Sequence, residues 1–77
     1  MDKREHILEL IYAERSKQDK KWGYPRYLSD PFWYTILGEE VGEIARGILE
    51  HDVENLKDEL VQVAAVCVAW LQNIMEE

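Results

Sequence analysis

Acidic residues at helical spacing are the part of this sequence that could do chemistry. Glu40 and Glu43 lie three positions apart, so in a helix their Cβ atoms would be about 5–6 Å apart and both side chains could reach one point. Glu40 also interrupts an apolar stripe, one turn from Ile36 and one turn from Ile44. A carboxylate at such a position needs a cation, a set of hydrogen bonds or a raised pKa.

A second pair at the same spacing, Glu59 and Gln62, follows on the next expected helix. If the two helices pack antiparallel across a turn near His51, Glu59 can face Glu40 and Glu43. Three carboxylates and an amide oxygen form an oxygen-only ligand set, which suits Mg²⁺ or Mn²⁺ and not zinc. The alternative is a solvated acidic surface, because sixteen acidic residues among 77 produce some pairs at this spacing by chance.

Three helices and one irregular connection are expected to position these side chains. The first helix should run from about Asp2, its N-cap, to Asp19. The segment 20–28 then breaks the periodicity, since Gly23 and Pro25 are both unfavourable inside a helix. This connection is basic and aromatic, which is more typical of a functional loop than of a linker.

The second helix is expected to start with Asp30 as N-cap and Pro31 at the first helical position, and to end near Glu50. Asp52 can cap the third helix. The apolar stripe of the second helix is Trp33, Ile36, Leu37, Val41, Ile44 and Ile48. The expected core stripe of the third helix is Leu56, Leu60, Val63, Cys67, Leu71 and Ile74. Glycines at 38, 42 and 47 weaken the second helix, which indicates close approach of a ligand or tight helix packing.

These elements predict an all-α protein, a small antiparallel helical bundle with a single domain over residues 1–77. From residue 60 to 71 the third helix is apolar on nearly every face, and such a helix must be buried all round. A chain this short cannot supply that cover alone, and its single cysteine, Cys67, excludes an internal disulfide. We therefore expect oligomerisation to complete the core, with Val61, Ala65 and Val68 facing another subunit.

Composition restricts the partners. A formal net charge of −7 argues against a nucleic acid polymer, because phosphate backbones are bound by excess Lys and Arg. The first residues lack the apolar core of a signal peptide, and no apolar run approaches the roughly 20 residues of a membrane span. The expected localisation is cytoplasmic, with no membrane contact.

The acidic pattern resembles a known family. Glu39-Glu40-x-x-Glu43 followed by Glu59-x-x-Gln62 is similar to the EExxE and ExxD motifs of the MazG-like, all-α nucleotide pyrophosphohydrolases. The segments 14–23 and 59–64 also look like that group, and the similarity extends over roughly residues 14–74. It implies Mg²⁺-dependent cleavage of a nucleoside triphosphate into a monophosphate and pyrophosphate by a homodimer or homotetramer.

The resemblance also implies residue roles. The metal ligands would be Glu40, Glu43, Glu59 and Gln62. The residues near the base or the phosphates would be Gln18, Lys21 and Trp22. Glu39 would be the catalytic residue that holds or deprotonates the attacking water. For Trp22, a core anchor beneath the loop is an equally weighted alternative.

One position departs from the family pattern. The last acidic ligand, usually Asp, is Gln62 here, and its amide oxygen can coordinate Mg²⁺ but brings no charge. A second interpretation therefore stands beside the enzyme: a catalytically weak or inactive helical module that binds a nucleotide or a protein and oligomerises.

Overall fold

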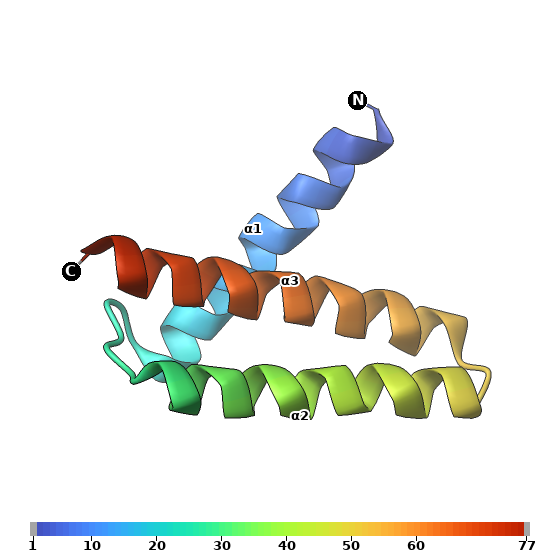
Figure 1. Ribbon diagram of the computed structural model, residues 1–77. Helices are drawn as coiled ribbons and strands as arrows, with labels where there is room; N and C mark the ends of the chain where they lie inside the picture. Colours follow the sequence, from blue (N-terminus) through green and yellow to red (C-terminus); the bar gives the residue numbers. More distant parts are fainter. Residues whose placement is uncertain (1, 77) are drawn as a thin grey trace.

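The computed structural model describes residues 2–76, which form α1 (Lys3–Trp22), α2 (Asp30–Leu49) and α3 (Val53–Glu76). Figure 1 shows α2 and α3 as an antiparallel hairpin that α1 crosses. α3 is the central helix, because it packs against both others while α1 and α2 make no backbone contact with each other. The described residues include no strand, so the predicted all-α antiparallel bundle is confirmed. None of the three helices is long and apolar enough to cross a membrane.

The starts of two helices agree with the sequence. Asp2 and Asp52 cap α1 and α3, each carboxylate accepting the backbone N–H three residues further on, at 2.8 and 3.1 Å. The N-cap of α2 was expected one residue too late. Ser29 is the cap, and its hydroxyl accepts the backbone N–H of Phe32. Asp30 is the first helical residue, and its carboxylate accepts a hydrogen bond from Trp70 Nε1 at 2.9 Å.

α1 extends further than the sequence suggested. It continues past Asp19 to Trp22, which places Lys20 and Lys21 in its last turn, where cations interact favourably with the negative end of the helix dipole. The helix stops at Gly23, whose φ of 90° and ψ of 160° belong to a region that only glycine occupies without strain.

The core is small and lies between α2 and α3. Trp33, Val66 and Ala69 are its buried members. The residues packed around them are Leu28, Ile36, Leu37 and Trp70. The stripe expected for α3 is therefore partly wrong, since Leu60, Leu71 and Ile74 are each about half exposed.

The outer face predicted for α3 also needs correction. Ala65 is completely buried, because it lies on the side of α3 that α1 covers. Val61 and Val68, one turn before and after it on this side, line grooves between α1 and α3. The self-association predicted through Ala65 is not possible in this fold.

The inward face of α2 determines where its carboxylates point. Val41 and Ile48, both expected in the core, are about half exposed. Trp33, Glu40 and Gly47 are turned inward instead. A Cβ at Gly47 would lie 3.3 Å from the Asn55 side chain of α3, so tight helix packing accounts for this glycine. Glu40 thus lies in the middle of the α2–α3 contact.

Candidate functional site

Glu40 on α2 and Glu59 on α3 form a pair of carboxyl groups inside the helical hairpin. Burial, followed by a hydrogen bond with Glu59, raises the pKa of Glu40 from 4.5 to about 7. The negative charges of Glu59, Glu43 and Glu14 raise it further. The antiparallel packing predicted from the sequence therefore does bring Glu59 opposite Glu40.

The pair leaves two oxygen atoms without a partner. Oε2 of Glu40 and Oε2 of Glu59 are both buried, and neither has a hydrogen-bond donor within the described part of the chain. Two ionised carboxylates offer only acceptors, so they can bond to each other only when Glu40 holds a proton and donates it to Glu59. In the absence of that proton, a cation is the group that would satisfy both oxygens.

Glu14 is a member of this acidic group that the sequence patterns did not identify as a ligand. It lies on α1, is half-buried, and its charge acts on Glu40. Glu14 lies three residues after Ile11, which belongs to the apolar face of α1. That spacing is the sequence signal that Glu14 points inward. Which carboxylates Glu14 approaches is shown only by the crossing of α1 over α3.

The other two predicted acids of α2 lie outside the Glu40–Glu59 contact. Glu39 is exposed, and Glu43 lies 3.9 Å from Arg46 on the next turn of α2. Over residues 2–76, no three His, Cys, Asp or Glu side chains gather closely enough to form a metal centre. The structure thus unites two of the predicted ligands, Glu40 and Glu59, and the assignment of all four remains a prediction.

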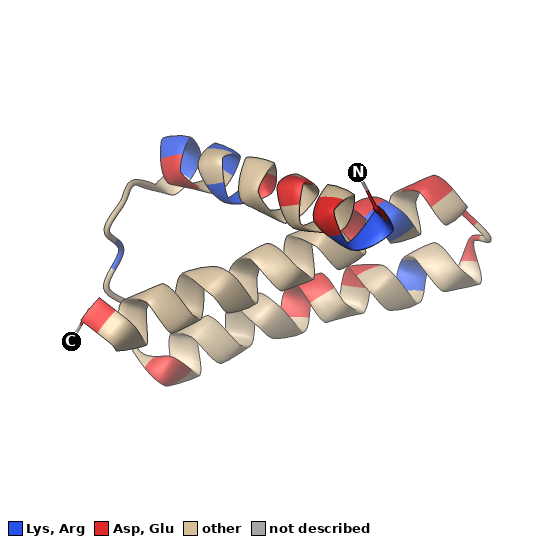
Figure 2. Cartoon of the chain, turned by 90° about the horizontal axis from the view of Figure 1, so that it is seen from above, with Lys and Arg blue, Asp and Glu red and all other residues tan. Residues whose placement is uncertain are grey.

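Gln62 lies beside this pair but on the α1 side of α3. It is half-buried and lines a groove with Glu14, Lys17, Asp58 and Lys57. Figure 2 shows acidic segments midway along the helices, and basic segments at the end of α1 and in the loop that follows. The groove thus brings two lysines, Lys17 and Lys57, next to the acidic residues Glu14 and Asp58.

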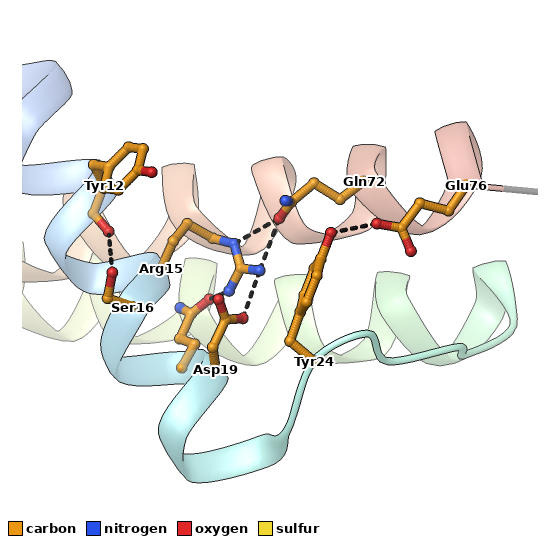
Figure 3. Close-up of polar contacts among 8 residues, drawn as sticks. Tyr12, Arg15, Ser16, Asp19, Tyr24, Gln72 and Glu76 are labelled. Atoms are coloured by element: carbon orange, nitrogen blue, oxygen red, sulfur yellow. Dashed lines mark hydrogen bonds and ion pairs between the residues drawn. The ribbon is translucent and has the colours of Figure 1, made fainter.

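Gln18, predicted to contact substrate, belongs to a polar cluster at the other end of the α1–α3 contact. Arg15 organises the cluster: its Nε and Nη2 donate to Gln72 Oε1 at 3.0 and 2.7 Å, and Nη1 donates to Gln18 Oε1 at 3.3 Å. Arg15 also forms an ion pair with Asp19 at 2.7 Å. Figure 3 shows Arg15 with Gln72 and Asp19, together with the Tyr24 hydroxyl.

Tyr24 connects the loop to the end of α3. Its hydroxyl donates to Glu76, and this bond raises the pKa of the phenol. The cavity enclosed by this cluster holds only about 10 Å³, enough for about one water molecule. A nucleobase therefore cannot enter it, and Gln18 can reach a substrate only at its rim.

Lys21 and Trp22 lie at the surface where α1 ends. The Trp22 ring is 57% exposed, so it is not the core anchor that was its alternative interpretation. Lys21 Nζ lies 4.8 Å and Arg26 Cζ 5.7 Å from the centre of its ring. Arg26 also stacks at 4.7 Å on Trp33, which continues the stack into the core.

Asn73 holds this loop against the bundle. It is only 5% exposed, and its Oδ1 accepts the Nε1–H of Trp33 at 2.6 Å and the backbone N–H of Leu28 at 2.9 Å. Two donors on one oxygen fix the orientation of the amide. No sequence pattern indicated this role, because the partners lie 40 and 45 residues away.

Comparison of the chain with protein-family models, with curated proteins and with solved structures finds no match.

Proposed function

We propose that this chain is an Mg²⁺-dependent nucleoside triphosphate pyrophosphohydrolase, the activity that its resemblance to the MazG-like family implies. The observation that supports it best is the pair of buried, unpartnered oxygens, Oε2 of Glu40 and Oε2 of Glu59. Two like charges at one place weaken a fold unless a cation or a proton joins them.

The donor set fits a hard divalent cation. Glu40 and Glu59 would hold it from opposite helices, with Glu43 and the amide oxygen of Gln62 as further ligands, all of them oxygen donors. Glu14 joins the proposal as a fourth negative charge that acts on the same place. When bound, Mg²⁺ would neutralise phosphate oxygens and favour attack of water at phosphorus.

The remaining residues would bind and orient the substrate. Glu39 is exposed on α2 next to Glu40, where its carboxylate can hold the attacking water and accept its proton. Lys21 offsets phosphate charge. Trp22 is largely exposed, and its ring would stack on the base, a contact worth about 1–3 kcal/mol. Gln18 would contribute from the rim of the Arg15 cluster, and the enzyme would act as a homodimer or homotetramer.

The second candidate is a helical module that binds a nucleotide or a protein partner without turnover. Gln62 supports it, because an amide replaces the negative charge of the expected Asp. The position of Glu43, 3.9 Å from Arg46, supports it as well, since of the expected ligands only Glu40 and Glu59 are in contact.

Pyrophosphate release from a panel of nucleoside triphosphates, with and without Mg²⁺, tests the proposal. We expect release only with the cation, and a loss of about a hundredfold or more in kcat/KM for Glu40→Gln or Glu59→Gln, equivalent to about 2.7 kcal/mol of transition-state stabilisation. The exposed Glu9→Gln removes one negative charge from α1 and should retain full activity.

The outcomes separate the candidates. Activity that survives Glu40→Gln and Glu59→Gln would remove the assigned roles. A nucleotide that raises the melting temperature together with Mg²⁺ but yields no product would favour the binding module. In that case Gln62→Asp is informative, because a gain of activity would identify the missing charge as the defect.

A further inference from the structure

One face of α3 remains uncovered by the rest of the chain. Its side chains recur at alternating steps of four and three residues. We call this set the α3 seam: Val53, Lys57, Leu60, Ala64, Cys67, Leu71 and Ile74. This 3.5-residue period is that of the a and d positions of a coiled coil. Val53, Leu60, Leu71 and Ile74 are half or more exposed, although they are the kind of side chain that such a seam buries.

The chain exposes more surface than an average folded monomer of its mass. The surface measures 5929 Å² for a mass of 9.1 kDa, whereas a folded monomer of this mass exposes about 4,900 Å². The excess of about 1,000 Å² is close to the roughly 800 Å² that each partner buries in a stable protein–protein interface. The excess thus matches the area that one half of a dimer interface would bury.

α1 adds to the uncovered face. Ile11, Arg15 and Gln18 pack toward α3, and Ile7 and Leu8 continue the same side of α1 by one turn. These two are at least half exposed, because the N-terminal half of α1 rises past α3 on the side away from α2, as Figure 1 shows. An apolar groove lies between α1 and α3 here. Its lining includes Leu8, Ile11, Tyr12, Val68 and Gln72.

We propose that a second copy of this chain covers the α3 seam, with the two α3 helices antiparallel about a two-fold axis. The register follows from the seam itself. An axis between Ala64 and Cys67 pairs Ala64 with Cys67 of the second copy, and Leu60 with Leu71. The smallest side chains of the seam then lie at the axis, where the helices approach most closely. The N-terminal half of each α1 then borders α3 of the other copy.

The charge of Lys57 favours the antiparallel arrangement of the two α3 helices over the parallel one. In a parallel pair, Lys57 of one copy would oppose Lys57 of the other within the seam, which is unfavourable. In the antiparallel pair, Lys57 lies beside Ile74 near the C-terminal end of the other α3. The helix dipole is negative there and favours a cation.

This inference rests on the self-association in the proposed function but not on the hydrolase activity. Sedimentation equilibrium without nucleotide tests it. We expect a dimer for the wild-type chain and a dissociation constant at least about tenfold higher for Leu60→Lys and for Leu71→Lys, since each change places two charges in the interface. The control Leu49→Lys removes an even more exposed leucine, at the end of α2 outside the seam, and should leave the constant unchanged.

Disulfide cross-linking in a Cys67→Ser background tests the direction, and does so even if a lysine variant fails to fold. The double variant Leu60→Cys with Leu71→Cys should form covalent dimers on mild oxidation, and each single variant should not. Cross-linking of a single variant to itself would overturn the antiparallel pairing. A dimer disrupted only by Leu49→Lys would overturn the α3 seam but retain self-association, and a wild-type monomer would overturn both.

Discussion

Glu40 occupies a position where its charge is poorly satisfied by the chain alone. Its carboxyl group lies inside the α2–α3 contact, faces Glu59, and feels the charges of Glu43 and Glu14. Each of these effects disfavours the ionised form, so the folded protein holds a proton on Glu40 to higher pH than the unfolded chain does. That difference makes stability depend on pH.

The sign of this dependence is determined by the raised pKa. Between pH 4.5 and about 7, the unfolded chain releases the Glu40 proton while the folded chain keeps it, so the free energy of unfolding should decrease as pH rises. We expect this loss to amount to roughly 1–2 kcal/mol after allowance for solvent screening, and to be complete above pH 7. Urea unfolding at several pH values without divalent cations measures it.

Glu40→Gln is the matching variant, because Gln cannot ionise. The decrease should largely disappear, and the variant should be more stable than the wild type above pH 7. The neighbouring, exposed Glu39→Gln should retain the wild-type slope. A Glu40→Gln profile parallel to that of the wild type would show that the Glu40–Glu59 contact does not control stability.

Single residues differed in how far the sequence could predict them. Glu40 was identifiable because a carboxylate at helical spacing within an apolar stripe is a local pattern. Asn73 was not, because its two donors, Trp33 and Leu28, come from distant segments. Glu14 lies between these cases: its inward side could be inferred from the spacing to Ile11, but its neighbours depend on the crossing of α1 over α3.

At the level of elements, the glycines have different physical roles. Gly23 ends α1 with a positive φ, and Gly47 lies where α2 and α3 approach closely. Gly38 has open space where a Cβ would be and lies in the interior of α2. The fold therefore explains why glycine stands at positions 23 and 47, but not at position 38.

This contrast gives a paired prediction. Gly38→Ala should stabilise the protein by about 1 kcal/mol, the difference in helix propensity between the two residues. Gly23→Ala should destabilise it by about 1–3 kcal/mol, because the side chain would be held in a backbone region that it rarely adopts. Thermal unfolding by circular dichroism measures both. Equal effects of the two substitutions would contradict the assignment of the α1 end.

The helices themselves were predictable, whereas their ends and faces were less so. Periodicity and capping residues indicated three helices in the correct order. Ser29, not Asp30, is the cap of α2, and the Asp30 carboxylate binds Trp70, which is 40 residues away. Periodicity also could not determine which side of α3 is left uncovered by α1 and α2. A helix that is apolar all round has no polar face to mark that side.

At the scale of the whole molecule, a hairpin and one crossing helix provide a small core. Trp33, Val66 and Ala69 form its buried part, and much of α3 is covered only if a second copy binds. The expectation that this chain completes its core by self-association rests on that shortage. Ala65 shows the limit of the sequence argument, because α1 already covers it.

The arrangement places its acidic pair at the centre of the hairpin and its basic and aromatic loop at one end of α1 (Figure 2). The proposed function therefore requires a nucleotide that reaches from one of these places to the other, because Gln18, Lys21 and Trp22 do not contact the carboxylates.

The central claim is that Glu40 and Glu59 together hold a divalent cation, and calorimetric titration of the protein with Mg²⁺ tests it most directly. We predict saturable binding by the wild-type chain that weakens by roughly tenfold or more in Glu40→Gln and in Glu59→Gln, and is unchanged in Glu9→Gln. Absence of binding to the wild-type chain, or equal affinity of all four proteins, would contradict the account.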